Sequence, residues 1–329
     1  MSEFDVCIIG AGPAGIAAAM RAWDFGKQVC IIEKGPLGGS GVHNGALSSK
    51  TLWELSRDYI NACRRDRGYI AENVEIDFPH VVNCVQRAIG EKVSQISEQF
   101  AALSQPRPGC PNCISLVRGS ARFLDSNTLF VEGNESSRSL KITAKHFIIA
   151  TGSRPRTLDE ITVDGSLIMT SDNMMDLMSF PRSMVILGAG IVGCEFATIF
   201  ANFGKTKVNV IDRQDRILPF EDPDISRVCS TNLEAKGVTI HHKSVFETAN
   251  RLPNKYENIV LLNPSAALIS TTASASAPYR NKANTASPGN SLRILSSSIE
   301  TAAVVVAISA TMGVKVFVIS AIATPAKAT

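Results

Sequence analysis

The stretch that decides the fold is FDVCIIGAGPAGIAAAMRAWDFGKQVCIIEK, residues 4–34. It opens with an apolar run, 4–9, which predicts a buried strand. The small apolar residues 14–22 predict a helix that can lie close against a sheet, and 28–32 predict a second strand. Between the first strand and the helix stands the spacing G-x-G-x-x-G. Strand, glycines, helix and strand in this order are typical of a unit that binds a dinucleotide.

The glycines and the acid that ends the second strand have separate expected tasks. Gly10 makes the tight turn, Gly12 lets the backbone approach a pyrophosphate, and Gly15 allows close packing of helix on strand. Pro13 suits the first turn of the helix, whose N-terminus attracts phosphate charge. Glu33 is placed to accept hydrogen bonds from a ribose. A merely structural glycine turn is the alternative, and the ordered context weighs against it.

A second copy of the pattern lies further along the chain. Residues 183–187 and 208–211 predict strands, and Asp212 ends the second of them. The glycine triplet repeats at Gly188, Gly190 and Gly193. Two successive fingerprints are typical of enzymes that hold FAD and NAD(P) together. Asp212 favours NAD, because an acid would repel the 2′-phosphate of NADP, whereas Arg213 and Arg216 keep NADP open.

Length, charge and cysteine usage limit the class of protein. The 329 residues suggest about two domains. The net charge is +3, but residues 250–329 hold seven Lys/Arg and two Glu, which leaves 26 basic and 28 acidic residues before them. This balance gives no electrostatic footprint for nucleic acid. Eight scattered cysteines and no evident signal peptide favour a cytoplasmic location.

Residues 35–50, GPLGGSGVHNGALSSK, carry a further motif. Here the sequence resembles the pyridine nucleotide–disulfide oxidoreductases, dihydrolipoamide dehydrogenase in particular, which have G-G-T-C-x-N-x-G-C-x-P-S-K at this point. Gly41 and Ala46 stand where that family has its two redox cysteines. Disulfide exchange needs two sulfurs, so we do not expect lipoamide or glutathione reduction by the family mechanism. The soluble transhydrogenase branch is a closer chemical parallel, since it has lost one cysteine and carries a His at the position of His43.

The resemblance also implies which residues surround the cofactors. Lys50 is expected beside the flavin ring, paired with Glu195; a solvated lysine and a helix-start acid are the alternative interpretations. His43 is a candidate to polarise a carbonyl or quinone oxygen, or else an ordinary polar loop residue. Ala121 and Val245 match family residues that touch adenine. The other candidate cofactor contacts, beyond the glycines and acids named above, are Pro13, Ala14, Lys34, Gly39, Ser40, Thr151, Gly152, Ile191 and Val192.

Cys110 and Cys113 form a single CxxC. Such a pair can be redox-active or half of a zinc site. No second CxxC or His pair stands at zinc spacing, so no metal is expected, and an incidental surface pair is favoured. A disulfide reductase that uses these two thiols is a further alternative.

The other elements follow from periodicity. Helices are expected over 46–65 and 81–103. Short strands are expected over 114–118, 121–124, 128–132, 140–143, 146–150 and 238–241, the first four as a small antiparallel excursion.

The resemblance is expected to end near Thr248, because the composition then changes. Of residues 250–329, 33 of 80 are Ser, Thr or Ala, and the Gly-Asp and C-terminal interface domain that the family requires are not found. A shift of reading frame would produce such a change, and other frames of the tail should then encode a Gly-Asp. Residues 302–323 are apolar enough for a membrane span, but Lys315 opposes this and the β-branched bias suits strands.

We therefore predict an α/β fold of two Rossmann-like, three-layer domains with parallel central sheets. The FAD domain is expected over 1–155, the NAD(P) domain over 156–249, and an atypical tail over 250–329. The predicted function is FAD-dependent hydride transfer from NAD(P)H to a small-molecule acceptor. The alternative is a truncated or frameshifted, inactive member that only binds nucleotide. Homodimers are usual in the family, but the interface region is not recognisable here.

Overall fold

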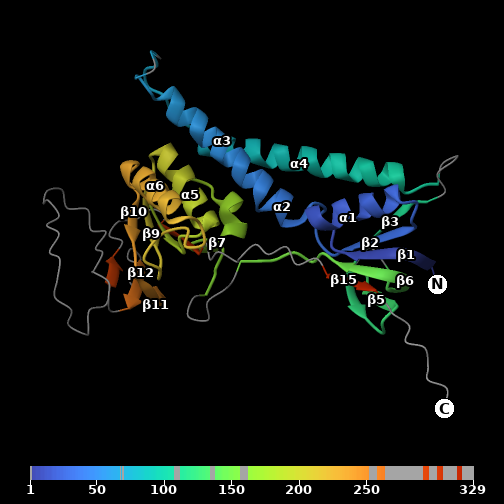
Figure 1. Cartoon of the computed structure of the whole chain (residues 1–329). Coiled ribbons are helices and arrows are strands. Elements are labelled where there is room, and N and C mark those ends of the chain that lie inside the picture. The colour runs from blue at the N-terminus through green and yellow to red at the C-terminus, as the bar shows by residue number, and fades with distance from the viewer. Residues whose placement is uncertain are drawn as a thin grey trace, which may run out of the picture. The chain divides into compact units, whose positions relative to one another are not determined.

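The computed structural model describes residues 2–66, 68, 70–106, 112–133, 138–155, 162–251, 258–263, 292–295, 302–306 and 317–320 (Figure 1). They form two compact units. Unit 1 contains Met1–Ser48, Gln86–Arg154 and β15 (Phe317–Ser320). Unit 2 contains Ser49–Val85 and the chain from Pro155 through β14 (Ala302–Val306). The helices α3 (Ala46–Ala62) and α4 (Phe78–Leu103) each carry the chain from one unit into the other.

The sheet of unit 1 is built around β1 (Ser2–Ile9). Its strand order is β3-β2-β1-β6-β5-β4, in which the first four strands are parallel and β4 and β5 are antiparallel. β15 pairs antiparallel with β6. The other strands are β2 (Val29–Glu33), β3 (Ile114–Arg118), β4 (Ser120–Phe123), β5 (Thr128–Glu132) and β6 (Leu140–Ile149).

Two details of this sheet differ from the sequence-based expectation. The strands expected over 140–143 and 146–150 are one strand, β6, because β1 offers it an unbroken parallel register from Ser2↔Ile142 to Ile9↔Ile149. β3 was expected in the antiparallel excursion, but it pairs in parallel with β2. Both differences come from partners distant in sequence, which the local pattern does not reveal.

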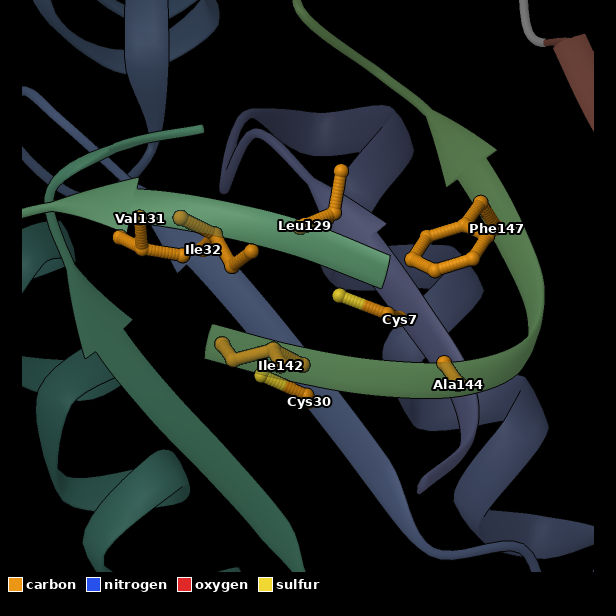
Figure 2. Close-up of a cluster of buried hydrophobic side chains, with 8 residues drawn as sticks. All are labelled: Cys7, Cys30, Ile32, Leu129, Val131, Ile142, Ala144 and Phe147. Atoms are coloured by element: carbon orange, nitrogen blue, oxygen red, sulfur yellow. The ribbon is translucent and has the colours of Figure 1, made fainter. Parts of the chain in front are cut away.

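The core of unit 1 lies among four of these strands. Figure 2 shows eight buried side chains packed together, from β1, β2, β5 and β6: Cys7, Cys30, Ile32, Leu129, Val131, Ile142, Ala144 and Phe147. Each has an exposed fraction of at most 1%. This burial is the hydrophobic term that holds the parallel and antiparallel parts of the sheet together.

An ion pair joins β1 to β6 at the edge of this core. Lys145 Nζ lies 2.8 Å from Asp5 Oδ1, and Asp5 Oδ2 accepts the Gln28 amide at 3.0 Å. The hydrogen bond from Lys145, followed by that from Gln28, holds the pKa of Asp5 below its ordinary value of 3.8.

Because its folded pKa is depressed, Asp5 stabilises the fold above the pKa of the unfolded chain, and this contribution is lost as pH falls through the folded value. We therefore expect the difference in unfolding free energy between the parent and Asp5→Asn to be largest at neutral pH and to shrink as pH falls below 3.8 and through the depressed folded pKa. Urea titrations of both proteins across this range measure it. A difference that does not change with pH would contradict the role of the Asp5 charge.

The five-stranded sheet of unit 2 is entirely parallel. Its order is β10-β9-β8-β14-β7. Two helices alternate with its strands, α5 (Ile191–Phe203) between β8 and β9 and α6 (Pro223–Ala235) between β9 and β10. The strands are β7 (Ile168–Thr170), β8 (Ser183–Leu187), β9 (Lys207–Ile211) and β10 (Thr239–His241). The predicted α/β class with parallel-dominated sheets is confirmed.

The tail contributes strands. β11 (Val245–Arg251), β12 (Asn258–Asn263) and β13 (Leu292–Leu295) form an antiparallel sheet, while β14 lies between β7 and β8. Of the apolar stretch 302–323, the described residues lie in β14 and β15, so they do not form one spanning helix. Within the described part of the chain, no helix combines the length and apolarity needed to cross a membrane.

Candidate functional site

The first glycine loop joins β1 to α1 (Pro13–Asp24). Gly10 has φ 106°, and a Cβ there would collide with the Ala150 carbonyl oxygen. At Gly15 a Cβ would collide with the Gly10 carbonyl oxygen, well inside 3.0 Å. At Gly12, in contrast, a Cβ would meet no atom within 4 Å. Packing therefore requires glycine at positions 10 and 15, whereas Gly12 faces open space.

Glu33 is bound to this loop. Its Oε2 accepts the Ala11 amide at 2.6 Å and its Oε1 accepts the Gly35 amide at 2.7 Å. These hydrogen bonds use one lone pair on each oxygen and leave the carboxylate able to accept more. The acid thus keeps the turn between the first two glycines in place.

The start of α1 leaves backbone amides free of side-chain partners. Gly12 is the N-cap residue, with φ −78° and ψ −176°, and within the described chain no side chain caps the helix or places an acid in its first turn. Gly39 packs against this point, since a Cβ there would lie 3.1 Å from the Gly12 Cα. Lys34 and Ser40, which lie on either side of residues 35–39 in the sequence, are exposed. Free amides at a helix N-terminus suit an anionic phosphate.

The second glycine loop joins β8 to α5 and repeats this arrangement. Gly188 has φ 102°, and a Cβ at Gly193 would collide with the Gly188 carbonyl oxygen. Asp212 Oδ2 accepts the Ala189 amide at 2.6 Å, and Oδ1 accepts the Gln214 amide at 2.7 Å. Gly190 is the N-cap of α5, again without a side-chain cap in the described structure, and Ile191 is 63% exposed beside it.

The surroundings of Asp212 bear on nucleotide choice. Arg213 is exposed directly after the acid. Arg216 donates from Nη2 to the Pro219 carbonyl oxygen at 2.7 Å. Val245 begins β11, and its side chain lies outside the described residues. Of the two arginines, Arg216 therefore already donates a hydrogen bond to a carbonyl of its own loop.

Lys50 and Glu195 come together within unit 2. The Lys50 ammonium forms an ion pair with Glu195 Oε1, and Ser49 Oγ donates to the same oxygen at 3.0 Å. Lys50 is 63% exposed, whereas the Glu195 side chain is 15% exposed. The ion pair predicted from the sequence forms, and Ser49 is a member that the sequence reasoning did not single out. Its position next to Lys50 in the matched motif was the available signal.

The other expected site residues occupy ordinary positions. His43 Nε2 donates to the Leu37 carbonyl oxygen at 2.9 Å, which leaves Nδ1 as the free ring nitrogen. The Ala121 side chain packs on the core of unit 1, and Thr151 and Gly152 are exposed after β6. Cys110 lies outside the described residues, and Cys113 donates to Gln28 Oε1 at 3.3 Å. The described residues contain no cluster of ligands that could hold a metal.

Two of the buried cysteines, Cys7 and Cys194, have raised pKa values. Burial, with Cys229 and Asp212 nearby, raises the pKa of Cys194 to about 12. A hydrogen bond with Cys30 and then burial raise the pKa of Cys7. Thiols with raised pKa values stay protonated at neutral pH, and the thiolate is the reactive form.

The chain is similar in sequence to known proteins. A soluble pyridine nucleotide transhydrogenase from Hahella chejuensis is 37% identical over 251 residues, which cover 75% of this chain and 51% of that protein. One from Mycobacterium tuberculosis is 34% identical over 242 residues, covering 73% and 50%. The chain spans about half the length of the curated relatives it matches.

A solved structure shares the fold. The Cu(II) complex of the HOCl-induced flavoprotein disulfide reductase RclA from Escherichia coli matches with a TM-score of 0.68 and 22% identity, covering 94% of this chain and 57% of that one. The family model described as pyridine nucleotide-disulphide oxidoreductase matches residues 4–272, past Thr248, where we expected the resemblance to end. Because that match takes in well over half of the sequence, the chain belongs to the pyridine nucleotide-disulphide oxidoreductase family.

Proposed function

We propose that the unit 1 loop binds FAD, that the unit 2 loop binds a nicotinamide nucleotide, and that hydride passes from NAD(P)H to the flavin and then to a small-molecule acceptor. The observation that carries this is the duplicated loop. In both units the acid at the end of the second strand, Glu33 or Asp212, accepts the amide between the first two glycines. Family membership supports the same assignment, since the relatives are pyridine nucleotide transhydrogenases.

The residues present fit a bound dinucleotide. Open space beside Gly12 lets a pyrophosphate approach the backbone, and the uncapped start of α1 offers its amides. The flavin, when bound, supplies the hydride chemistry, and the protein supplies binding, orientation and charge. Glu33 and Asp212 accept ribose hydroxyls while keeping their loops in place. We propose Lys34, Gly39, Ser40, Ala121, Thr151 and Gly152 as further FAD contacts, and Ile191, Val192 and Val245 as further nucleotide contacts.

Lys50 is proposed to place a positive charge beside the flavin ring, as the family resemblance implies. Its ammonium is held by Glu195, and Ser49 donates a second hydrogen bond to the same carboxylate oxygen. A cation in that place stabilises negative charge on the reduced ring by Coulomb attraction. His43 is a weaker candidate to polarise a carbonyl or quinone oxygen. Its Nε2 is bound to the Leu37 carbonyl, so Nδ1 is the ring nitrogen that could do so.

The hydride is proposed to leave the flavin without a sulfur relay. Gly41 and Ala46 occupy the positions of the two family cysteines. At Gly41 a Cβ would lie 2.5 Å from the Pro13 Cγ, so the local packing leaves no room for a side chain there. The raised pKa of Cys194 supports the same view, because this thiol stays protonated.

NAD is the proposed nicotinamide nucleotide. Asp212 would repel a 2′-phosphate, and Arg216 is engaged with the Pro219 carbonyl. Arg213 is the residue that could still accept NADP. A comparison of flavin reduction by equal concentrations of NADH and NADPH decides between them.

A cofactor-loading spectrum tests the proposal. The purified protein is expected to be yellow, with roughly one flavin per chain, and to bleach when NADH is added without oxygen. NADH should act faster than NADPH. A colourless protein that also takes up no added FAD would overturn the proposal.

The runner-up is a chain that binds nucleotide without turnover. Its support is the change of composition from residue 250 onward, where Ser, Thr and Ala make up 33 of 80 residues. It predicts binding of FAD or NADH with no bleaching. A disulfide reductase that uses Cys110 and Cys113 predicts instead that alkylation of these thiols stops NADH-dependent reduction of lipoamide or glutathione. Homodimer formation and a cytoplasmic location stay predictions.

A further inference from the structure

Two polar contacts join α3 to α5 within unit 2. The first is the pairing of Ser49 and Lys50 with Glu195. The second is a hydrogen bond from Asn202 Nδ2 to Ser56 Oγ, 3.1 Å long. Ser56 and Asn202 each lie seven residues, or two helical turns, beyond Ser49 and Glu195. Because the contacts ascend together, the two helices run in the same direction.

The second contact is part of a series of hydrogen bonds that starts at the exposed Lys236 and ends at buried residues. Lys236 Nζ donates to Asn202 Oδ1 at 2.7 Å, Asn202 donates to Ser56, and Ser56 Oγ donates to the Trp53 carbonyl oxygen at 2.7 Å. Asn202 is 6% exposed and Ser56 is fully buried. All three donors point the same way, so each bond polarises the next.

All three hydrogen bonds can form in only one register of α3 on α5. A shift of α3 by about one turn would bring Leu52 or Tyr59 towards Asn202 in place of Ser56. Neither can accept well there: Leu52 is apolar and 1% exposed, and the Tyr59 ring already packs against Phe203 with 6.1 Å between centroids. The Asn202 amide would then be buried without a partner, which is costly. A single buried Asn fixes the register of coiled coils by the same physics.

We propose that Asn202, with Ser56, is a positioning residue that sets the register of α3 on α5 and so holds Lys50 on Glu195. Asn202 does not touch Lys50. It acts by fixing the position of α3, the helix that carries Lys50. The consequence for the flavin rests on the proposed function, since it uses the proposed place of Lys50. The positioning itself does not depend on any cofactor.

The test measures the reactivity of Lys50 in the protein without added cofactor. Reductive methylation needs the free amine, so a lysine held on a carboxylate reacts more slowly than a free one. The degree of modification is read by peptide mass spectrometry, with the exposed Lys205 as the internal reference. Glu195→Gln is expected to raise the Lys50 rate about three-fold relative to Lys205, the scale of a part-exposed ion pair.

Asn202→Leu is expected to raise the Lys50 rate by about the same factor, because the register is no longer fixed. Thr198→Val is the matched control: Thr198 lies between the two contacts on α5 and donates only to the Cys194 carbonyl of its own helix, at 2.8 Å. It should leave the Lys50 rate at the parent value. If Asn202→Leu does not fold, Ser56→Ala removes the other half of the contact and carries the same expectation.

The outcomes are separable. A parent-like Lys50 rate in Asn202→Leu (or in Ser56→Ala) overturns the proposal, and so does an unchanged rate in Glu195→Gln, since Lys50 would then not be held by Glu195 in solution. A rise in Thr198→Val equal to that in Asn202→Leu also overturns it, because the effect would be general loosening of α5. A parent protein that is colourless and takes up no added FAD, by contrast, overturns the proposed function and leaves the labelling comparison intact.

Discussion

Gly15→Ala is expected to give a colourless protein. The new methyl group would collide with the Gly10 carbonyl oxygen, which is backbone and cannot rotate away, so the first turn of α1 must move off β1. That movement breaks the loop that Glu33 holds through the Ala11 amide. We expect flavin affinity to fall by roughly 100-fold or more, equivalent to about 2.7 kcal/mol. Overpacking of this kind also lowers unfolding free energy by about 1–3 kcal/mol. Flavin content of the purified variant and a urea titration measure the two effects.

Gly12→Ala separates binding from folding. Its backbone angles are open to any residue, and the added Cβ meets no protein atom within 4 Å. The unfolding free energy should therefore stay within about 1 kcal/mol of the parent value, because the gain from a less flexible unfolded chain opposes the loss of glycine at the N-cap of α1. Flavin content should still fall, because the methyl group occupies the space that a pyrophosphate would enter. A Gly12→Ala protein as yellow as the parent would mean that phosphate does not approach this loop.

Gly193→Ala is expected to stay yellow but to resist reduction by NADH. The methyl group would collide with the Gly188 carbonyl oxygen and displace the start of α5 from β8. The loop of unit 1 is untouched, so flavin should remain bound. We expect the rate of bleaching at low NADH to drop by roughly 100-fold, again equivalent to about 2.7 kcal/mol. Anaerobic stopped-flow absorbance measures this rate.

Two controls show whether the loss is specific to the nucleotide. Dithionite needs no nicotinamide site, so it should bleach Gly193→Ala as fully as the parent. Gly204→Ala changes the other end of α5, where φ is 62° and a Cβ would meet open space. It should cost about 1 kcal/mol of stability through the left-handed backbone while leaving NADH reduction intact. Equal loss of NADH reduction in both variants would show that α5 as a whole, and not its N-terminus, is at fault.

Much of the site could be predicted from the sequence because its geometry is local. Gly15 and Glu33 act within a single strand–helix–strand segment, and the spacing of the motif fixes their relative places. Gly10 belongs to the same segment, but the atom that excludes a Cβ there is the carbonyl oxygen of the distant Ala150. The same holds for Gly193 and Asp212 in unit 2. The ion pair of Lys50 with Glu195 could not be predicted from local spacing, because it joins residues far apart in the chain. Only the resemblance to a family suggested it.

Other features could not be predicted because they depend on partners distant in sequence. Strand β6 is continuous only because β1 pairs with it along its whole length. The buried pair Ser56 and Asn202 gives no pattern that marks it, since a serine and an asparagine in a helix are usually exposed.

The sequence by itself therefore determined that there are two glycine loops, each followed by a helix and each closed by an acid. The tertiary structure decided what faces what: that both acids bind their own loops, that Ser49 joins Lys50 on Glu195, and that Asn202 meets Ser56. The reason is the range of the interactions. A tight turn is specified by a few neighbouring residues, whereas the register between two helices is set by packing and buried hydrogen bonds that exist only once the chain has folded.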